Sequence, residues 1–131
     1  MADIAVREVV TAVRIASTAE ALDAAVWPAD ATPLRLAPDD VLLVGVRHVE
    51  APEPHAIVFV DTGWARFRVS PIVGAELMRA GAAWPAPASG LGQGMILGVP
   101  AKLVVADGEW WVLVLGAVAD EFEERLHEVF E

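Results

Sequence analysis

The stretch that decides the fold reads Trp64-Ala65-Arg66-Phe67-Arg68-Val69-Ser70-Pro71. Its first six residues alternate, which is typical of a β-strand with one face against a core. Ser70 followed by Pro71 predicts the start of a helix. Ser caps the first turn, and Pro has no backbone N–H that would need an acceptor there. The small and apolar residues of the strand are expected to face the core. The other three face the opposite way: Trp64, Arg66 and Arg68.

Downstream of this strand, the helix that begins at Pro71 is expected to end at Gly81. Its predicted buried stripe is Ile72, Val73, Leu77 and Met78. The Pro, Ala and Gly-rich stretch 82–94 has no periodicity and is predicted to be a surface loop.

The C-terminal part predicts a hairpin and a closing helix. Asp107-Gly108-Glu109 lies between the apolar runs 103–106 and 110–115, which is a strong hairpin signal. In the hairpin, Trp110-Trp111 places one indole on each face of a strand, one for the core and one as a candidate interface anchor. Apolar residues then recur at helical spacing in 119–130: Phe122, Leu126, Val129 and Phe130.

The N-terminal half predicts a second strand, helix and hairpin. Residues 7–16 are rich in β-branched side chains and predict a strand. Ser17-Thr18-Ala19-Glu20 reads as a capping box in which Ser17 accepts from the backbone, and the helix is expected to continue to Val26. Residues 33–36 and 41–46 predict a hairpin, and the wholly apolar run 56–60 predicts a strand covered on both faces.

Two strand-helix-strand passages in succession, each with an added hairpin, predict an α+β protein. The expected sheet is mainly antiparallel with helices packed on one face, in a ferredoxin-like split βαβ topology. A length of 131 residues fits a single domain, 1–131, with a sizeable core.

Composition excludes several classes of function. The net charge is −10 and Lys102 is the only lysine, so the surface would repel a phosphate backbone and nucleic acid is not an expected partner. The chain has no Cys, which removes thiol chemistry. No apolar run approaches the about 20 residues that cross a bilayer, and no signal peptide is recognisable, so we expect a cytoplasmic protein without a membrane partner.

Local clusters of polar residues offer weak candidates for sites. The glycine-rich run 90–94 lacks the Lys and Ser or Thr of a phosphate loop. His48 and His55 flank Glu50 and Glu53 on a predicted loop without regular register, where ligands are more often adventitious. Asp61-Thr62 ends a strand and reads as a turn. We therefore assign no catalytic, cofactor-binding or metal residue.

Several motifs carry a resemblance to a known family. They are Phe59-Val60-Asp61-Thr62, Gly92-Gln93-Gly94 before an apolar strand, the run 34–44 around Pro38-Asp39, and the closing strand and helix 111–126. With these the chain resembles the aminomethyltransferase-like group of the glycine cleavage T protein and, more closely, the gamma subunit of heterotetrameric sarcosine oxidase, a complex of sarcosine catabolism.

The resemblance implies a role beside larger flavoprotein subunits. In folate-using members an acidic residue follows the helix, whereas here the region is Gly81-Ala82-Ala83-Trp84-Pro85, which cannot replace a carboxylate. A non-catalytic gamma-like subunit is therefore expected, with FAD, FMN, NAD and folate held by its partners. Two alternatives stay open: a stand-alone folate or small-ligand binding domain, and a self-associating ferredoxin-like dimer.

Trp64, Arg66 and Arg68 are the candidate partner interface. An aromatic residue flanked by two guanidiniums has the composition of interface centres. The alternative is that a helix of the same domain covers Trp64 while the arginines offset local acids.

Overall fold

The computed structural model describes residues 4–131, apart from the side chain of Thr62. The chain forms two compact units. Unit 1 contains residues up to Val9 and Trp64–Glu131, and unit 2 contains Val10–Gly63. The strands β1 (Val6–Ala16) and β4 (Ile57–Val69) each contribute residues to both units. The expectation of one domain over 1–131 stays a prediction.

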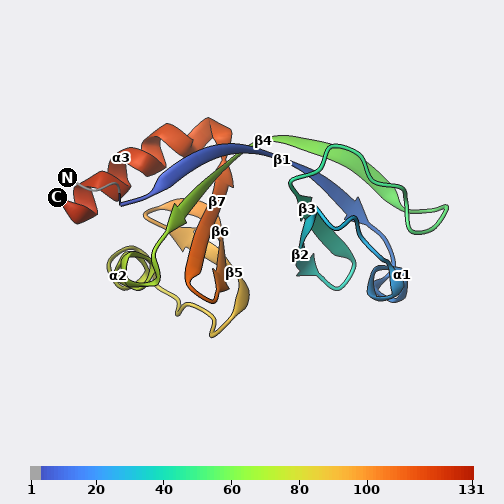
Figure 1. The fold of residues 1–131 in the computed structure, drawn as a ribbon, viewed down its shortest axis with the longest axis horizontal. Coiled ribbons are helices and arrows are strands. Elements are labelled where there is room, and N and C mark those ends of the chain that lie inside the picture. The colour runs from blue at the N-terminus through green and yellow to red at the C-terminus, as the bar shows by residue number, and fades with distance from the viewer. Residues whose placement is uncertain (1–3) are drawn as a thin grey trace. The chain divides into compact units, whose positions relative to one another are not determined.

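Unit 1 is a sheet with two helices. The strands run in the order β1-β4-β7-β6-β5, and β4, β7, β6 and β5 pair antiparallel with their neighbours. Figure 1 shows α2 and α3 beside these strands. The elements of this unit other than β1 and β4 are α2 (Pro71–Gly81), β5 (Gly90–Ile96), β6 (Val99–Ala106), β7 (Glu109–Leu115), the 3-10 turn Gly116–Val118 and α3 (Ala119–Phe130).

The core of unit 1 lies between one face of the sheet and the two helices. Phe67 from β4 and Phe122 from α3 meet at its centre, with ring centroids 5.0 Å apart and planes tilted by 56°. Ala65 belongs to the same core, and Val69 on the same side of the strand is also buried, which confirms the predicted alternation of β4. The two helices contribute Leu77, Met78, Phe122 and Leu126.

Helix α2 begins and ends where its sequence predicts. The Ser70 hydroxyl accepts from the Val73 amide at 3.2 Å, Pro71 occupies the first turn, and the helix ends at Gly81. The predicted stripe is wrong at Ile72, which is 84% exposed. Gly74 takes the buried position instead, because a Cβ there would lie 2.3 Å from the Trp110 ring.

The glycines of β5 make room for a tryptophan. The stretch predicted to be a loop up to residue 94 already becomes a strand at Gly90. Cβ atoms added at Gly92 and Gly94 would lie 2.8 and 2.3 Å from the Trp84 ring system. The indole N–H of Trp84 donates to the Met95 carbonyl at 2.9 Å. The glycine-rich run therefore has a packing role that no local pattern indicated.

Unit 2 contains the strands in the order β2-β3-β1-β4, with α1 against the sheet. Its remaining elements are α1 (Ala19–Ala24), β2 (Thr32–Ala37) and β3 (Asp40–Val44), so the predicted hairpin of β2 and β3 is confirmed. The core includes Val13, Ile15, Leu22, Val41, Leu43, Val46 and Val49.

The predicted capping box of α1 is wrong in its details. Thr18, and not Ser17, caps the helix by accepting from the Ala21 amide at 3.1 Å. The Ser17 hydroxyl donates instead to Glu53 at 2.8 Å. The helix ends at Ala24, so Val26 lies beyond it and is 94% exposed.

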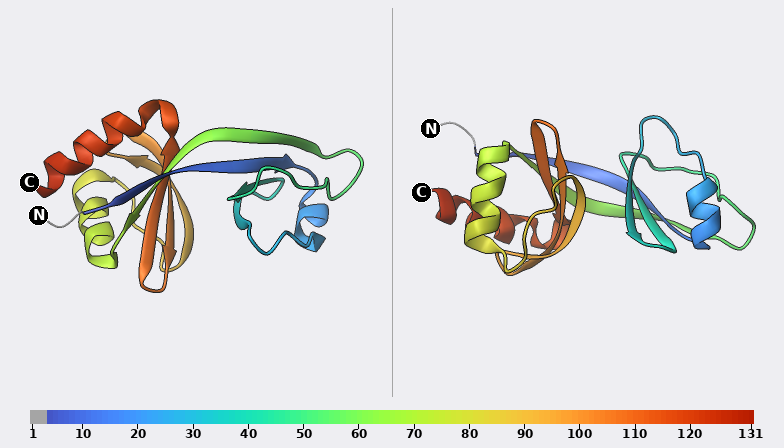
Figure 2. Two further views of the ribbon diagram at one scale, coloured as in Figure 1. Left: turned by 45° about the horizontal axis from the view of Figure 1, so that its top comes forward. Right: turned by 90° about the horizontal axis from the view of Figure 1, so that it is seen from below.

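The first residues of β4 are not covered as predicted. The run 57–60 was expected to be buried on both faces, but all four side chains are exposed: Ile57 64%, Val58 37%, Phe59 44% and Val60 52%. In all three ribbon views this half of β4 runs beside β1 (Figure 2). An apolar composition alone cannot distinguish a buried strand from one that is left uncovered.

The ferredoxin-like split βαβ prediction is wrong. Such a topology needs parallel strands on either side of each helix. The strands that flank α2 are β4 and β5, and the chain of antiparallel pairings through β7 and β6 makes them antiparallel. In unit 2, β1 and β2 do share a direction, but α1 has six residues and buries only Leu22, too little to cover a sheet. The ferredoxin-like dimer is therefore no longer a candidate.

No helix within residues 4–131 is both long enough and apolar enough to cross a membrane.

The core of unit 1 predicts that substitutions on the two sides of α3 differ strongly in their effect on the free energy of unfolding. Phe122→Ala should lower the free energy of unfolding by about 3–5 kcal/mol, because Phe122 is fully buried against Phe67. Glu124→Ala, on the exposed side of the same helix, should change it little. Chemical denaturation of both variants checks this. Equal stabilities would mean that the register of α3 is wrong.

Candidate docking face

The sheet face of unit 1 opposite the helices gathers charged and aromatic side chains. The register sets Trp64, Arg66 and Arg68 of β4 across from Leu115, Leu113 and Trp111 of β7, so all six share this face. On the other side of β7, Lys102 of β6 lies across from Leu113. We call this surface the arginine face, and it consists of Glu8, Trp64, Arg66, Arg68, Lys102, Glu109, Trp111 and Leu113.

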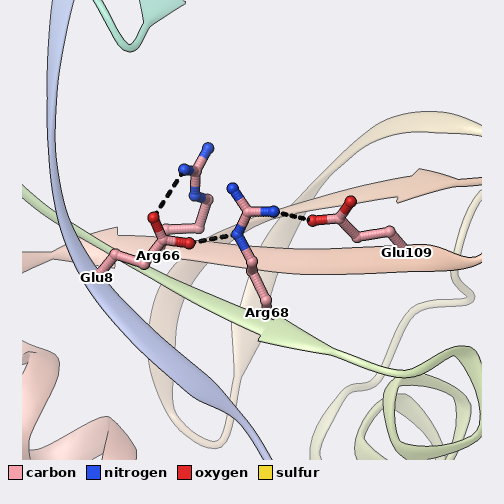
Figure 3. Close-up of polar contacts among 4 residues, drawn as sticks. All are labelled: Glu8, Arg66, Arg68 and Glu109. Atoms are coloured by element: carbon pink, nitrogen blue, oxygen red, sulfur yellow. Dashed lines mark hydrogen bonds and ion pairs between the residues drawn. The ribbon is translucent and has the colours of Figure 1, made fainter.

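Glu8 holds the two arginines together (Figure 3). One of its carboxylate oxygens accepts from Arg66 at 3.0 Å, and the other accepts from Nε of Arg68. Arg68 also donates to Glu109, which stands at the end of the 107–108 turn. The hydrogen bond from Arg66, with that from Arg68 and their charges, lowers the pKa of Glu8 against the opposing effect of burial.

Cations also lie over the aromatic rings of this face. The Arg66 guanidinium is 5.2 Å from the ring centroid of Trp111, and the Lys102 ammonium is 5.6 Å from that of Trp64. Both distances are within the range of cation–π attraction. Lys102 also donates to Gln93 of β5 at 3.0 Å. The face thus carries three cations against two carboxylates, in a chain of net charge −10.

The predicted interface residues do share one face, but they differ in exposure. Trp64 is 8% exposed, and the side chains of Arg66 and Arg68 are 16% and 41% exposed. The arginines offset local acids, as the alternative interpretation held. Arg68 is therefore the member with most surface to offer. The docking of a partner on these residues stays a prediction.

Two buried donors on this face lack an acceptor among the described residues: Trp64 Nε1 and Arg66 Nε. A buried donor without an acceptor costs about 1–3 kcal/mol. An acceptor for either donor would have to come from water or from a molecule bound on this face.

A hollow of about 350 Å³ adjoins Lys102 at the edge of the arginine face. Its walls are mainly apolar, and Lys102 and Gln93 are its polar side chains. The residues that line it include Trp64, Gln93, Met95, Lys102, Leu113 and Leu115. No local pattern in the sequence predicts this hollow, because its walls come from four strands that only the pairing of the sheet brings together.

Among the His and Glu residues of the 48–55 loop, Glu53 has a structural role. Glu53 accepts from the His55 amide at 2.7 Å and from Ser17, and these hydrogen bonds lower its pKa. His48, Glu50 and His55 are exposed. Within residues 4–131, apart from the Thr62 side chain, no three His, Asp or Glu side chains gather as metal ligands would.

The loop that follows α2 contains Trp84 and has no carboxylate in the stretch Gly81–Pro85. A hollow of about 450 Å³ beside it is lined by residues of α2 and of the loop 82–86, with Trp110. Arg79 is its charged lining residue, and its guanidinium donates to Glu76 at 2.9 Å. Of the pair Asp61-Thr62, Asp61 contributes by its charge to the raised pKa of Arg14, after the larger effect of Asp40 and against the opposing effect of burial. The side chain of Thr62 lies outside the described residues.

No protein-family model matches the sequence, and no curated protein matches it. Among solved structures, the chain is similar to a chain of heterotetrameric sarcosine oxidase from Corynebacterium sp. U-96, determined in complex with pyrrole 2-carboxylate. The TM-score is 0.69 at 16% identity, and the match covers 98% of this chain and 86% of that chain. At this identity the likeness is one of fold, and it extends over nearly the whole of both chains. Membership of the gamma subunit family stays a prediction.

The Glu8 cluster predicts a pH dependence of stability. A carboxyl whose pKa is lowered on folding stabilises the fold above its unfolded pKa, and this contribution is lost as pH falls below about 4. Glu8→Gln should therefore lower the melting temperature at pH 7 and make its decline toward pH 3 shallower. Melting curves across this range check it, with Glu124→Gln as the matched control. Parallel profiles for Glu8→Gln and wild type would contradict the prediction.

Proposed function

We propose that this chain is a non-catalytic subunit of a heteromeric, flavin-dependent oxidoreductase of the sarcosine oxidase type. The observation that carries the proposal is the fold likeness, which runs through 98% of this chain and 86% of a chain of a heterotetrameric sarcosine oxidase. A likeness of that extent is what two equivalent subunits would share. The role of this chain would be to stabilise larger subunits, and those partners would bind FAD, FMN, NAD and folate.

The chemistry of the arginine face supports a docking role. Arg68 is 41% exposed and Arg66 lies against Trp111, so the face combines guanidiniums with aromatic area. Arg and Trp are the residues that interfaces favour at their centres. A partner surface with carboxylates would complement the positive balance of this face.

The Trp84 region supports a non-catalytic role. Trp84 packs on the glycines of β5, and no carboxylate stands in the stretch Gly81–Pro85. This stretch therefore supplies no carboxylate that could accept a proton or orient a cofactor.

A small-ligand binding domain is the second candidate, and the hollow beside Lys102 favours it. A volume of about 350 Å³ with apolar walls, one ammonium and one amide suits a small organic anion. Folate should raise the melting temperature of the isolated chain, and Lys102→Ala should abolish that rise. This result would support the small-ligand candidate over the subunit candidate.

Purification from the native host tests the subunit proposal. A tagged chain expressed at its native level should co-purify with larger subunits that carry flavin absorbance, identified by mass spectrometry. The chain purified alone should show neither flavin absorbance nor oxidase activity. Elution of the native chain alone, or only with copies of itself, would contradict the proposal.

Two arginine variants test the docking face within that complex. Arg68→Ala should reduce the recovered larger subunits at least tenfold at limiting concentration, because it removes a guanidinium that is 41% exposed on the arginine face. Arg79→Ala is the matched control, an ion-paired and exposed arginine on α2 outside this face. Native mass spectrometry gives the ratios. Equal assembly of the two variants would show that this face is not where the partner docks.

A further inference from the structure

The exposed segment 57–60 at the start of β4 contains no charged residue to protect it. Residues 57–60 read Ile-Val-Phe-Val, and Ala56 before them is apolar as well. Successive residues of a strand point to opposite faces, so the exposure of all four means that neither face of this segment is covered. The Arg14 guanidinium lies 5.9 Å from the centroid of the Phe59 ring.

This segment is also a sheet edge in unit 2. The neighbours of β4 in the sheet are β1 and β7, and β7 pairs with β4 only through Trp64–Val69. Among the described residues, the side of 57–60 away from β1 therefore faces no strand. Soluble proteins protect such edges with Lys, Pro, bulges or a covering loop. An apolar edge without these features is a template for an added strand.

Unit 2, which contains this edge, is acidic, and its charge indicates what kind of strand would fit. Residues 10–63 contain eight Asp and Glu against three Arg. Two of those arginines are already in ion pairs, Arg14 with Asp40 and Arg35 with Asp23. Asp61 follows the segment directly. A second copy of this chain would bring the same acids and a further net charge of −10, so like-charge repulsion disfavours it.

We propose that residues 57–60 are a docking edge to which a larger subunit adds an extended, apolar segment with basic flanks. Main-chain hydrogen bonds to the free edge would provide affinity, and the basic flanks would meet the acids of unit 2. The inference rests on the proposed function in taking the occupant from a larger subunit. It concerns a surface separate from the arginine face.

The test uses a double variant with a closely matched control. Ile57→Lys with Val60→Lys places one lysine on each face of the segment. Ile72→Lys with Val26→Lys makes the same two changes at side chains that are 84% and 94% exposed elsewhere. In the complex purified from the native host, the edge variant should recover at least tenfold less of the larger subunits than the control. Both variants should melt like wild type.

A second arm uses the purified full chain and needs no natural partner. The probe is the labelled peptide Lys-Val-Thr-Val-Thr-Val-Lys, and its counterpart has Glu at both ends. The lysine-ended peptide should bind at least tenfold tighter by fluorescence anisotropy and should slow hydrogen exchange in 57–60. The edge variant should lose this binding and the control variant should keep it.

The outcomes separate the inference from the function on which it rests. If wild type recovers no larger subunit while the peptide protects 57–60, the subunit proposal fails and the docking edge stands. Equal assembly of the edge and control variants overturns the docking edge, as does a lysine-ended peptide that leaves 57–60 unprotected. A homodimer that the edge variant abolishes also overturns it, because the occupant is then a second copy.

Discussion

The contact between Phe67 and Phe122 is the interaction on which the rest of unit 1 depends. It joins the C-terminal part of β4 to the first turn of α3 and is buried completely. Once Phe67 points to the helices, the pleat of the strand turns Arg66 and Arg68 to the opposite face. The same packing explains why Arg7 of β1 reaches α3, where it donates to Asp120 at 2.8 Å. One buried aromatic pair thus determines which side of the sheet becomes core and which becomes the arginine face.

Local patterns predicted the elements whose signals lie within a few residues of one another. The alternation of 64–69, the Ser70-Pro71 cap and the 107–108 turn all formed as expected, because each depends on neighbouring side chains and backbone. The strand directions were not predictable in the same way. The run 82–94 includes the start of a strand, β5. Its glycines at 92 and 94 are needed because the Trp84 ring packs on them, and that contact is not visible in a local pattern. The prediction for the run 56–60 failed for a different reason, since an apolar composition does not distinguish a buried strand from one that is left exposed.

The candidate site was predictable by residue type but not by environment. Arg66 and Arg68 were recognisable from the alternation, whereas their acceptor Glu8 lies 58 and 60 residues away in the chain. No spacing rule connects residues so distant, because the connection exists only through the neighbouring positions of β1 and β4. The burial of Trp64 and the place of Lys102 beside it depend on the same strand order. A face of this composition is predicted from the register of a sheet more than from any motif.

The seating of Trp84 on β5 has a consequence for how the sequence can change over time. The indole fills the space that side chains at positions 92 and 94 would need, and its N–H is tied to the Met95 carbonyl. A larger residue at either glycine would expel the ring, and a smaller residue at 84 would leave a void above the strand. Positions 84, 92 and 94 are therefore free to diverge only together, so related sequences should show covariation among these three positions.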